Sequence, residues 1–144
     1  MEALQLSLQK TLADAFTLYF KAHTFHWNVE GPDFKQYHDL FGGIYEEVFG
    51  SVDDIAEHIR QIDGYTPTAL KQLSQLTIIS EEETVMPALQ MVKNLLDANN
   101  LMLVSLMRSY READAASELG LANFLQDRIA AHQKHAWMLK ATLK

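Results

Sequence analysis

The sequence predicts an all-α protein: four long helices packed as a bundle, with a short extra helix in the connection between the second and the third. Three observations predict this class. Apolar residues recur at steps of three and four along most of the 144 residues, only six glycines and three prolines interrupt them, and the periodic segments are separated by short breaks. Since a bundle buries the apolar stripe of each helix against its neighbours, we expect a single domain over residues 1–144.

The first two long helices are bounded by glycine and proline. The first starts close to residue 1 and ends near Val29, where the Gly-Pro pair at 31–32 stops it. The second runs from about Asp33 to Asp63, and Gly64 ends it. Their core stripes are Leu4, Leu8, Leu12, Ala15, Phe16 and Tyr19 in the first, and Phe41, Ile44, Val48, Val52, Ile55, Ile59 and Ile62 in the second.

The short helix follows. Thr66 looks like an N-cap and Pro67 like a first helical residue, which predicts a helix through about Gln75. A plain up-and-down bundle needs no helix in this connection.

The third and fourth long helices have less definite starts. The serine and glutamate at 80 and 83 have the spacing of a capping box, but Pro87 is late for a first turn and favours a start nearer Val85. The last helix runs from about Ala115 to the end of the sequence, with a bend or restart near Gly120.

Composition excludes several classes of function. With no cysteine, the chain has no disulfide, zinc-thiolate site, iron-sulfur cluster or thiol nucleophile, so any metal must take imidazole and carboxylate ligands. The net charge of -7 opposes binding to DNA, because such binding depends on lysine and arginine. No run of about 18 apolar residues predicts a membrane span, and no signal peptide is apparent, so we expect a cytoplasmic protein.

A second line of residues follows the second helix beside its core stripe. A solvated polar face is one reading of this line. Two features argue against this reading. An apolar residue stands at the middle of the line, and one end of the line is a histidine whereas the other end carries carboxylates. The line consists of His38, Gly42, Glu46, Phe49, Asp53 and Glu57.

The two ends of this line suit one metal but cannot share it within one chain. His38 and Glu57 are nineteen residues apart, about 28 Å along a helix. A second copy lying antiparallel across a two-fold axis near residues 47 and 48 brings them together, and it creates two equivalent sites. His26 can approach His38 through the Gly-Pro corner. The predicted site therefore combines His26 and His38 of one copy with Asp53 and Glu57 of the other.

At these residues the chain resembles the Dps (DNA-protection-during-starvation) family of mini-ferritins. The resemblance lies in "HTFHWNVEGPDF", "HDLF", "DDIAEHIRQIDGYTP" and "KHAWMLKATL", and it covers nearly the whole chain. It implies a ferritin-like bundle, a dodecameric shell that stores iron, and oxidation of Fe(II) at dimer interfaces, typically by hydrogen peroxide. The family's ferroxidase ligands fall on His26, His38, Asp53 and Glu57.

The sequence departs from the family pattern in two places. The pattern has a carboxylate one turn after the second histidine, where this chain has Gly42. Its loss should weaken binding of a second iron; Glu46 is a candidate substitute, His58 a poorer one, and zinc a second candidate metal. The family's lysine-rich tail is also missing, since Lys140 and Lys144 make no basic arm, and we expect DNA binding to be weak or absent.

Other polar and aromatic residues have two readings each. Trp27 is either a packed aromatic or an electron donor near the iron. His132 and His135 are spaced for metal binding, but a solvated face or packing against Trp137 is the simpler reading. No Glu-x-x-His motif, which ordinary ferritins place at the bundle centre, occurs in the sequence, and this favours an interface site.

The family's iron-entry pores lie near the start of the last helix. Asn123 stands where an aspartate is common, so entry should depend on Asp127, with Glu118 before it. Three further carboxylates are candidates for mineral nucleation facing the cavity, although exposed helix carboxylates are usually only solvated. They are Glu46, Glu47 and Asp54.

These features predict an iron-oxidising and iron-storage mini-ferritin that protects against peroxide and ferrous iron. The alternative is a structural or nucleoid-associated shell whose interface site, impaired by Gly42, binds zinc or little metal. A third possibility is a helical-bundle partner protein, which would be a monomer.

Overall fold

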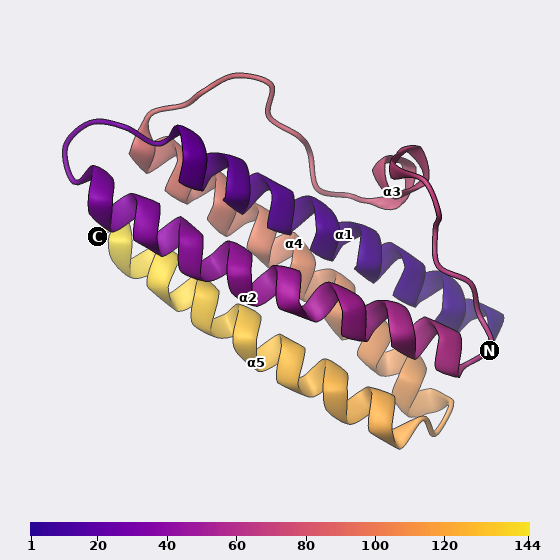
Figure 1. Ribbon diagram of the computed structural model, residues 1–144. Coiled ribbons are helices and arrows are strands. Elements are labelled where there is room, and N and C mark those ends of the chain that lie inside the picture. The colour runs from indigo at the N-terminus through magenta and orange to yellow at the C-terminus, as the bar shows by residue number, and fades with distance from the viewer.

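The structure, a computed structural model, describes residues 1–144, and every regular element in it is a helix. Four long helices lie side by side, and a crossover carrying one short helix runs along the bundle (Figure 1). The predicted fold class is confirmed. The helices are α1 (Glu2–Asn28), α2 (Phe34–Gln61), α3 (Leu70–Leu76), α4 (Ala88–Ala115) and α5 (Leu119–Thr142). None of them carries a stretch long and apolar enough to span a bilayer.

The connections set the directions of the helices. A tight corner joins α1 to α2, with Gly31 at φ 98° and Asp33 at φ 62°, so these helices are antiparallel neighbours. The crossover then returns to the other end of the bundle before α4 begins, so α2 and α4 run in the same direction (Figure 1). The unusual connection inferred from the sequence is therefore a crossover as long as the bundle.

The predicted core stripes are largely correct. One hydrophobic cluster fills the space between the four long helices, and the α2 stripe enters it at every position except Val52, which is partly exposed and packs against the cluster. The largest fully buried side chains in it are Phe41, Leu4, Leu8, Leu18, Ile44, Ile55, Ile59, Met91, Leu95, Met102, Leu106 and Leu125.

The predicted start of the short helix is wrong. Helix α3 begins at Leu70, not at Thr66 and Pro67. The side-chain oxygen of Gln72 accepts hydrogen bonds from the backbone N–H groups of Thr68 and Ala69, at 2.7 and 3.1 Å. A glutamine inside the helix, rather than a threonine before it, therefore fixes the start.

Both predicted starts of the third long helix are also wrong. Helix α4 begins at Ala88, after Pro87, and residues 80–87 are non-helical. The segment just before them is held to α1: buried Asp14 accepts hydrogen bonds from the Thr77 hydroxyl (2.6 Å) and the Ile78 N–H (2.9 Å). This tertiary tether overrides the local capping pattern.

The turn between α4 and α5 lies close to Ala115, where the sequence predicts the boundary of the last helix. Helix α4 ends at Ala115 and α5 restarts at Leu119, with Ser117 between them at φ 58°. A left-handed residue cannot continue an α-helix, so the chain breaks here. The expectation of a restart near Gly120 is close to the observed start.

Candidate metal centre at the corner of α1 and α2

The corner between α1 and α2 brings two histidines into contact. His26 lies in the last turn of α1 and His38 near the start of α2. Their rings stack, with centroids 3.7 Å apart and planes inclined by 18°. The Nδ1 atom of each ring lies 2.7 Å from the backbone carbonyl oxygen of the other residue. The approach inferred from the Gly-Pro corner is present, and it takes the form of a reciprocal pair.

These contacts determine which ring nitrogen is free. A carbonyl oxygen only accepts hydrogen bonds, so the Nδ1 of His26 and of His38 each carries the hydrogen and donates it. In a neutral imidazole the lone pair is then on Nε2, the atom available to a metal. Backbone carbonyls commonly orient histidine ligands in this way. The two imidazoles are therefore held in a metal-competent form before any metal arrives.

Gly42 is what allows His26 to lie here. A Cβ atom built on Gly42 would be 3.1 Å from both Cε1 and Nδ1 of the His26 ring, closer than side chains normally approach. The missing carboxylate therefore does not simply leave open space. The His26 ring lies directly against α2 at this position, and a longer residue would have to displace it.

The carboxylates form a separate pair farther along α2. Asp53 and Glu57 are both exposed, one helical turn apart. A side-chain hydrogen bond with Asp53, followed by repulsion from its charge, raises the pKa of Glu57 above its usual value. Such a pair presents two oxygen-rich groups, and a divalent cation would relieve the repulsion between them.

One subunit holds the four predicted ligands as two separate pairs. The described chain contains no group of three or more histidine, aspartate or glutamate residues that could hold a metal. This agrees with the separation of about 28 Å expected between His38 and Glu57 along α2. Whether the pairs meet across a two-fold contact stays a prediction.

The surface near the two pairs carries exposed aromatic side chains. The side chain of Phe49, between the pairs, is 52% exposed and packs on the Tyr19 ring with centroids 4.6 Å apart. Three other aromatic side chains on α1 and the start of α2 are also exposed. They are Phe20, Trp27 and Phe34. Exposed aromatic groups gathered on one face commonly mark a contact surface.

An aromatic cluster lies directly beside His26. His23 stacks between Tyr45, with centroids 3.9 Å apart, and Trp27, at 4.0 Å. The Tyr19 hydroxyl lies 3.0 Å from His23 Nδ1. Burial, and then the neighbouring His26, lower the pKa of His23. Trp27 contacts the rings of His23 and Phe20 and is 56% exposed. The i, i+4 spacing of Tyr19 and His23 is the sequence signal that could have revealed this cluster.

The two histidines of α5 do not lie on a solvated face, and that expectation is wrong. His132 and His135 are buried, whereas Trp137 is 61% exposed. The His135 Nε2 atom lies 2.8 Å from Glu47 Oε1, and His132 Nε2 lies 3.1 Å from Nη2 of Arg128. The sequence reasoning missed Arg128, although its spacing of four from His132 places both on one face of α5.

Glu47 joins this network. Its carboxylate is therefore not free to nucleate mineral, the role for which the sequence made it a candidate. Its carboxylate pairs with both terminal nitrogens of Arg128, at 2.5 and 2.9 Å. Burial alone would raise the pKa of Glu47, but hydrogen bonds from His135 and Arg128 lower it far below its usual range. Burial, and then the Arg128 charge, lower the pKa of His132 to about 3. The bundle centre is thus a neutralised ion-pair network.

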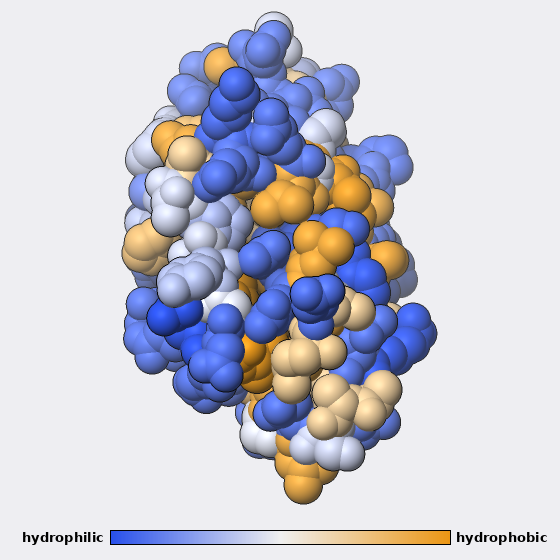
Figure 2. Space-filling model, turned by 90° about the vertical axis from the view of Figure 1, so that its right-hand side faces the viewer, coloured by the Kyte–Doolittle hydropathy of each residue, from blue (hydrophilic) through white to orange (hydrophobic).

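The residues predicted for the entry pore are on the surface at the start of α5. Asn123 and Asp127 are exposed one turn apart. At this end of the bundle hydrophobic residues lie among hydrophilic ones (Figure 2), and Leu119 and Tyr65 are each 75% exposed. The structure leaves these groups accessible to neighbouring copies.

The other carboxylates and the last histidine of this region are simpler. Glu46 and Asp54 are exposed, as expected for solvated helix carboxylates. His58 packs its ring on Phe124, with centroids 4.7 Å apart, and burial lowers its pKa. It therefore points toward α5 rather than to the carboxylate pair, which agrees with the expectation that it is the poorer substitute ligand.

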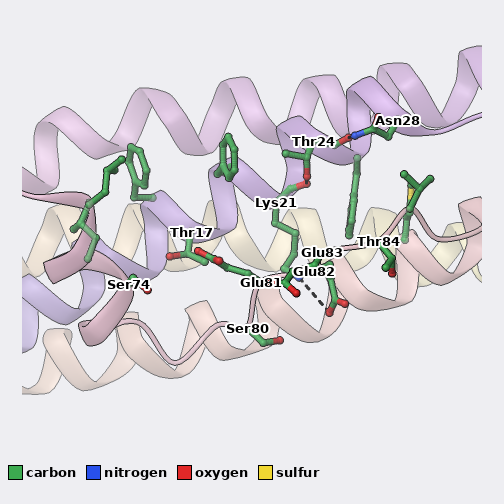
Figure 3. A pocket seen from close by; sticks show the side chains of 17 residues that line it. Thr17, Lys21, Thr24, Asn28, Ser74, Ser80, Glu81, Glu82, Glu83 and Thr84 are labelled. Atoms are coloured by element: carbon green, nitrogen blue, oxygen red, sulfur yellow. Dashed lines mark hydrogen bonds and ion pairs between the residues drawn. The ribbon is translucent and has the colours of Figure 1, made fainter.

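A separate cavity of about 450 Å³ lies between α1, α3 and the crossover, and no histidine lines it. Lys21 reaches across it toward Glu82, 3.8 Å away, while Glu81 and Glu83 flank that residue (Figure 3). The Lys21 ammonium also donates to Asn94, at 2.6 Å. With its cation already paired, this cavity offers no constellation for catalysis.

Comparison with known proteins agrees with this geometry. A family model for the ferritin-like domain matches residues 5–144. The DNA protection during starvation protein of Brevibacillus brevis is 33% identical over 138 residues, covering 95% of this chain and 92% of that protein. The chain belongs to the Dps family of mini-ferritins.

Solved Dps structures have the same fold. A Dps protein from Bacillus brevis superposes with a TM-score of 0.94 at 31% identity, covering 99% of this chain and 96% of that one. Dps from Thermosynechococcus elongatus superposes with a TM-score of 0.96 at 25% identity, covering 99% and 91%. Membership of the Dps family supports a role in iron storage and protection in general.

Proposed function

We propose that this Dps subunit pairs with a second copy through an antiparallel contact of α2 and oxidises Fe(II) at the two sites so formed. Each site would combine His26 and His38 of one copy with Asp53 and Glu57 of the other. One observation carries the proposal. The two side chains of each pair lie together in one chain, yet their ligand atoms are unused. The imidazoles have free Nε2 atoms, and a cation would relieve the repulsion between the two carboxylates.

The exposed aromatic face supports the pairing. Isologous contact about an axis near residues 47 and 48 buries Phe49 and brings residues at opposite ends of α2 together. Burying a large aromatic side chain contributes about 1.5–3 kcal/mol. Apolar burial at the middle of the contact, with metal ligands at both ends, accounts for the order of residues along this face.

The ligands have distinct roles in the proposed site. The two imidazoles hold the first Fe(II) through Nε2, and Glu57 binds the same ion across the contact as a carboxylate. Asp53, one turn away, holds a second ion or a bridging water. Because Gly42 brings no carboxylate, we expect the first ion to be held more firmly than the second, with Glu46 the nearest replacement.

The reaction is a one-electron oxidation of each iron. Two Fe(II) ions lose one electron each, and one hydrogen peroxide takes both electrons with two protons to give two molecules of water. The protein supplies ligands and confinement, and the iron is the substrate. Removing Fe(II) and peroxide together lowers the supply of hydroxyl radical, a role in keeping with the protective names of the relatives.

Storage requires the pairs to assemble further. We propose a closed homo-oligomer, a dodecamer by analogy with the Dps family, in which Asp127 and Asn123 lie at the iron entry. Two sites of this kind per dimer would feed iron inward. With a net charge of -7, the chain should bind DNA weakly or not at all near neutral pH.

The test compares peroxide-driven Fe(II) oxidation by the native protein with that of His38→Ala and Glu57→Ala variants. We expect both variants to lose at least ~10-fold in rate, because each removes a ligand of the same ion. Equal rates in all three proteins would remove the proposed activity.

A second candidate rests on Gly42. Two imidazoles and two carboxylates also suit Zn²⁺, and without a further carboxylate the site could be a zinc-binding or inactive feature of a structural shell. Iron loading separates the two. A shell that takes up no iron mineral yet retards DNA in a gel at low salt would favour the structural role.

A further inference from the structure

The centre of the bundle holds a second group of metal-type ligands that are not free. Glu47 reaches in from α2, and His132 and His135 from α5. A carboxylate and two imidazoles are a common ligand set for zinc and iron. Ferritin-like di-metal proteins place their metals in this part of the bundle. In this chain a guanidinium lies among these three side chains.

The guanidinium of Arg128 lies between the carboxylate of Glu47 and the imidazole of His132. Its Nη2 atom is 2.9 Å from Glu47 Oε1 and 3.1 Å from His132 Nε2, and its Nη1 atom is 2.5 Å from Glu47 Oε2. A single positively charged group therefore donates hydrogen bonds to a carboxylate and to an imidazole lone pair together. A metal in this place would need ligand atoms at about 2.0–2.2 Å, a contraction of about 1 Å.

His132 already has the support of a metal ligand. The Asn99 Oδ1 atom lies 2.8 Å from His132 Nδ1, and Asn99 Nδ2 donates to the His132 carbonyl oxygen, also at 2.8 Å. The hydrogen of the neutral ring is thus on Nδ1, and the lone pair of Nε2 points at Arg128. Histidine ligands typically have their other nitrogen fixed by a partner of this kind.

We propose that Arg128 is a built-in cation that takes the place of a divalent metal at the bundle centre and so excludes metal from it. Iron is then confined to sites outside the bundle core. Access is not the barrier, because 37% of the Glu47 side chain is exposed. The exclusion comes from the positive charge and from occupied ligand atoms. The proposal does not depend on the proposed function, since it concerns a different group of residues.

Removing the cation should expose the ligand set. His132 and Glu47 would supply two ligand atoms at once. His135 would supply a third through Nε2 after its proton moves to Nδ1, an atom that is buried and has no hydrogen-bond partner. We therefore expect neutral substitutions of Arg128 to create a metal site, and a positive one not to.

The experiment uses a background with the proposed interface ligands removed, His38→Ala with Glu57→Ala, so that any metal bound is not at the α2 contact. Arg128→Gln, which keeps most of the volume, and Arg128→Ala are added separately, with Arg128→Lys as the charge-retaining control. Co²⁺ is titrated and followed by its visible absorption, and the Tm is measured with and without Zn²⁺.

We expect the Gln and Ala variants to bind one Co²⁺ per subunit and to gain about 5 °C or more in Tm at saturating Zn²⁺. The background protein and Arg128→Lys should show neither effect, and adding His132→Ala should abolish both. Zinc-dependent refolding of an otherwise unfolded Ala variant would equally support the proposal. Failure of both neutral variants to bind Co²⁺, failure to fold even with Zn²⁺, or equal binding by the background protein would overturn it.

Discussion

The two groups of ionisable residues in this molecule differ in how complete they are. At the bundle centre Glu47, Arg128 and two histidines are hydrogen-bonded to one another within one chain, and the positive charge is part of the protein. On the outer face of α2 the histidine pair and the carboxylate pair lie apart, with free Nε2 atoms at one end and two carboxylates that repel each other at the other. The first group is paired within one chain, whereas the second needs both a partner subunit and a cation.

This difference separates stability from function. The network at the bundle centre is already paired with its own cation, and it braces the bundle by joining α2 to α5. Groups that are oriented but unused are costly to maintain without a ligand, and they lie on an exposed aromatic face. Substitutions in the two regions should therefore have opposite effects on iron oxidation and on the free energy of unfolding.

The largest effect is expected at the carboxylate pair. Glu57→Gln should lower the rate of Fe(II) oxidation about 10–100-fold, because the proposed site loses a charged ligand. Its stability should be unchanged or slightly raised, because the repulsion with Asp53 is relieved. Stopped-flow oxidation and urea unfolding on the same preparation measure both. A variant that oxidises iron normally but unfolds easily would reverse the roles assigned to the regions.

The matched change at the bundle centre is Glu47→Gln. We expect it to lower the free energy of unfolding by about 2 kcal/mol, less than for a fully buried pair because the Glu47 side chain is partly exposed. The oxidation rate should stay within about 2-fold of native, since the residue lies away from the ligand pairs. Urea denaturation measures the loss. An unchanged unfolding midpoint would mean that the network does not brace α2 against α5.

The two regions should also differ in their response to acid. The pKa of His132 is lowered from 6.5 to about 3 in the folded protein, so between these values the unfolded chain binds the extra proton. Stability should therefore be lost as the pH falls from 6.5 toward 3. His132→Gln removes this contribution, and its unfolding free energy should depend less steeply on pH over that window. Equal slopes for native protein and variant would contradict the assignment.

The smallest effect is expected at adjacent glycines. Gly43 has nothing within 4 Å of an added Cβ, so Gly43→Ala should raise stability by up to about 1 kcal/mol without altering oxidation. Gly42→Ala gains the same helix propensity but crowds the His26 ring at 3.1 Å, so it should gain less stability and slow oxidation a few-fold. If both variants oxidise iron equally well, the position of the His26 ring does not matter.

The fold could be predicted because helix periodicity is a local signal that survives in the complete structure. The four long helices and their core stripes follow from spacing alone. The start of α3 has a local signal that was missed, because Gln72 caps the backbone N–H groups three and four residues before it. The start of α4 could not be found, since the segment before it is held to Asp14 of α1 by contacts that local capping patterns do not contain. Distant partners decide such boundaries.

The candidate site divides in the same way. The contact of His26 with His38 followed from the Gly-Pro corner, which is local. The burial of His132 and His135 did not follow, because their partners Glu47 and Asn99 come from other helices. At Gly42 the sequence shows only that a carboxylate is missing. The close approach of the His26 ring to this position depends on the tertiary structure.

The most direct test of the central claim mixes two inactive proteins. His38→Ala and Glu57→Ala subunits are unfolded together, refolded and assayed for peroxide-driven Fe(II) oxidation. If each site takes histidines from one copy and carboxylates from the other, a mixed dimer contains one fully native site, and about a quarter of the native activity should return. Activity that stays at the level of the separate variants would contradict a site shared between two copies.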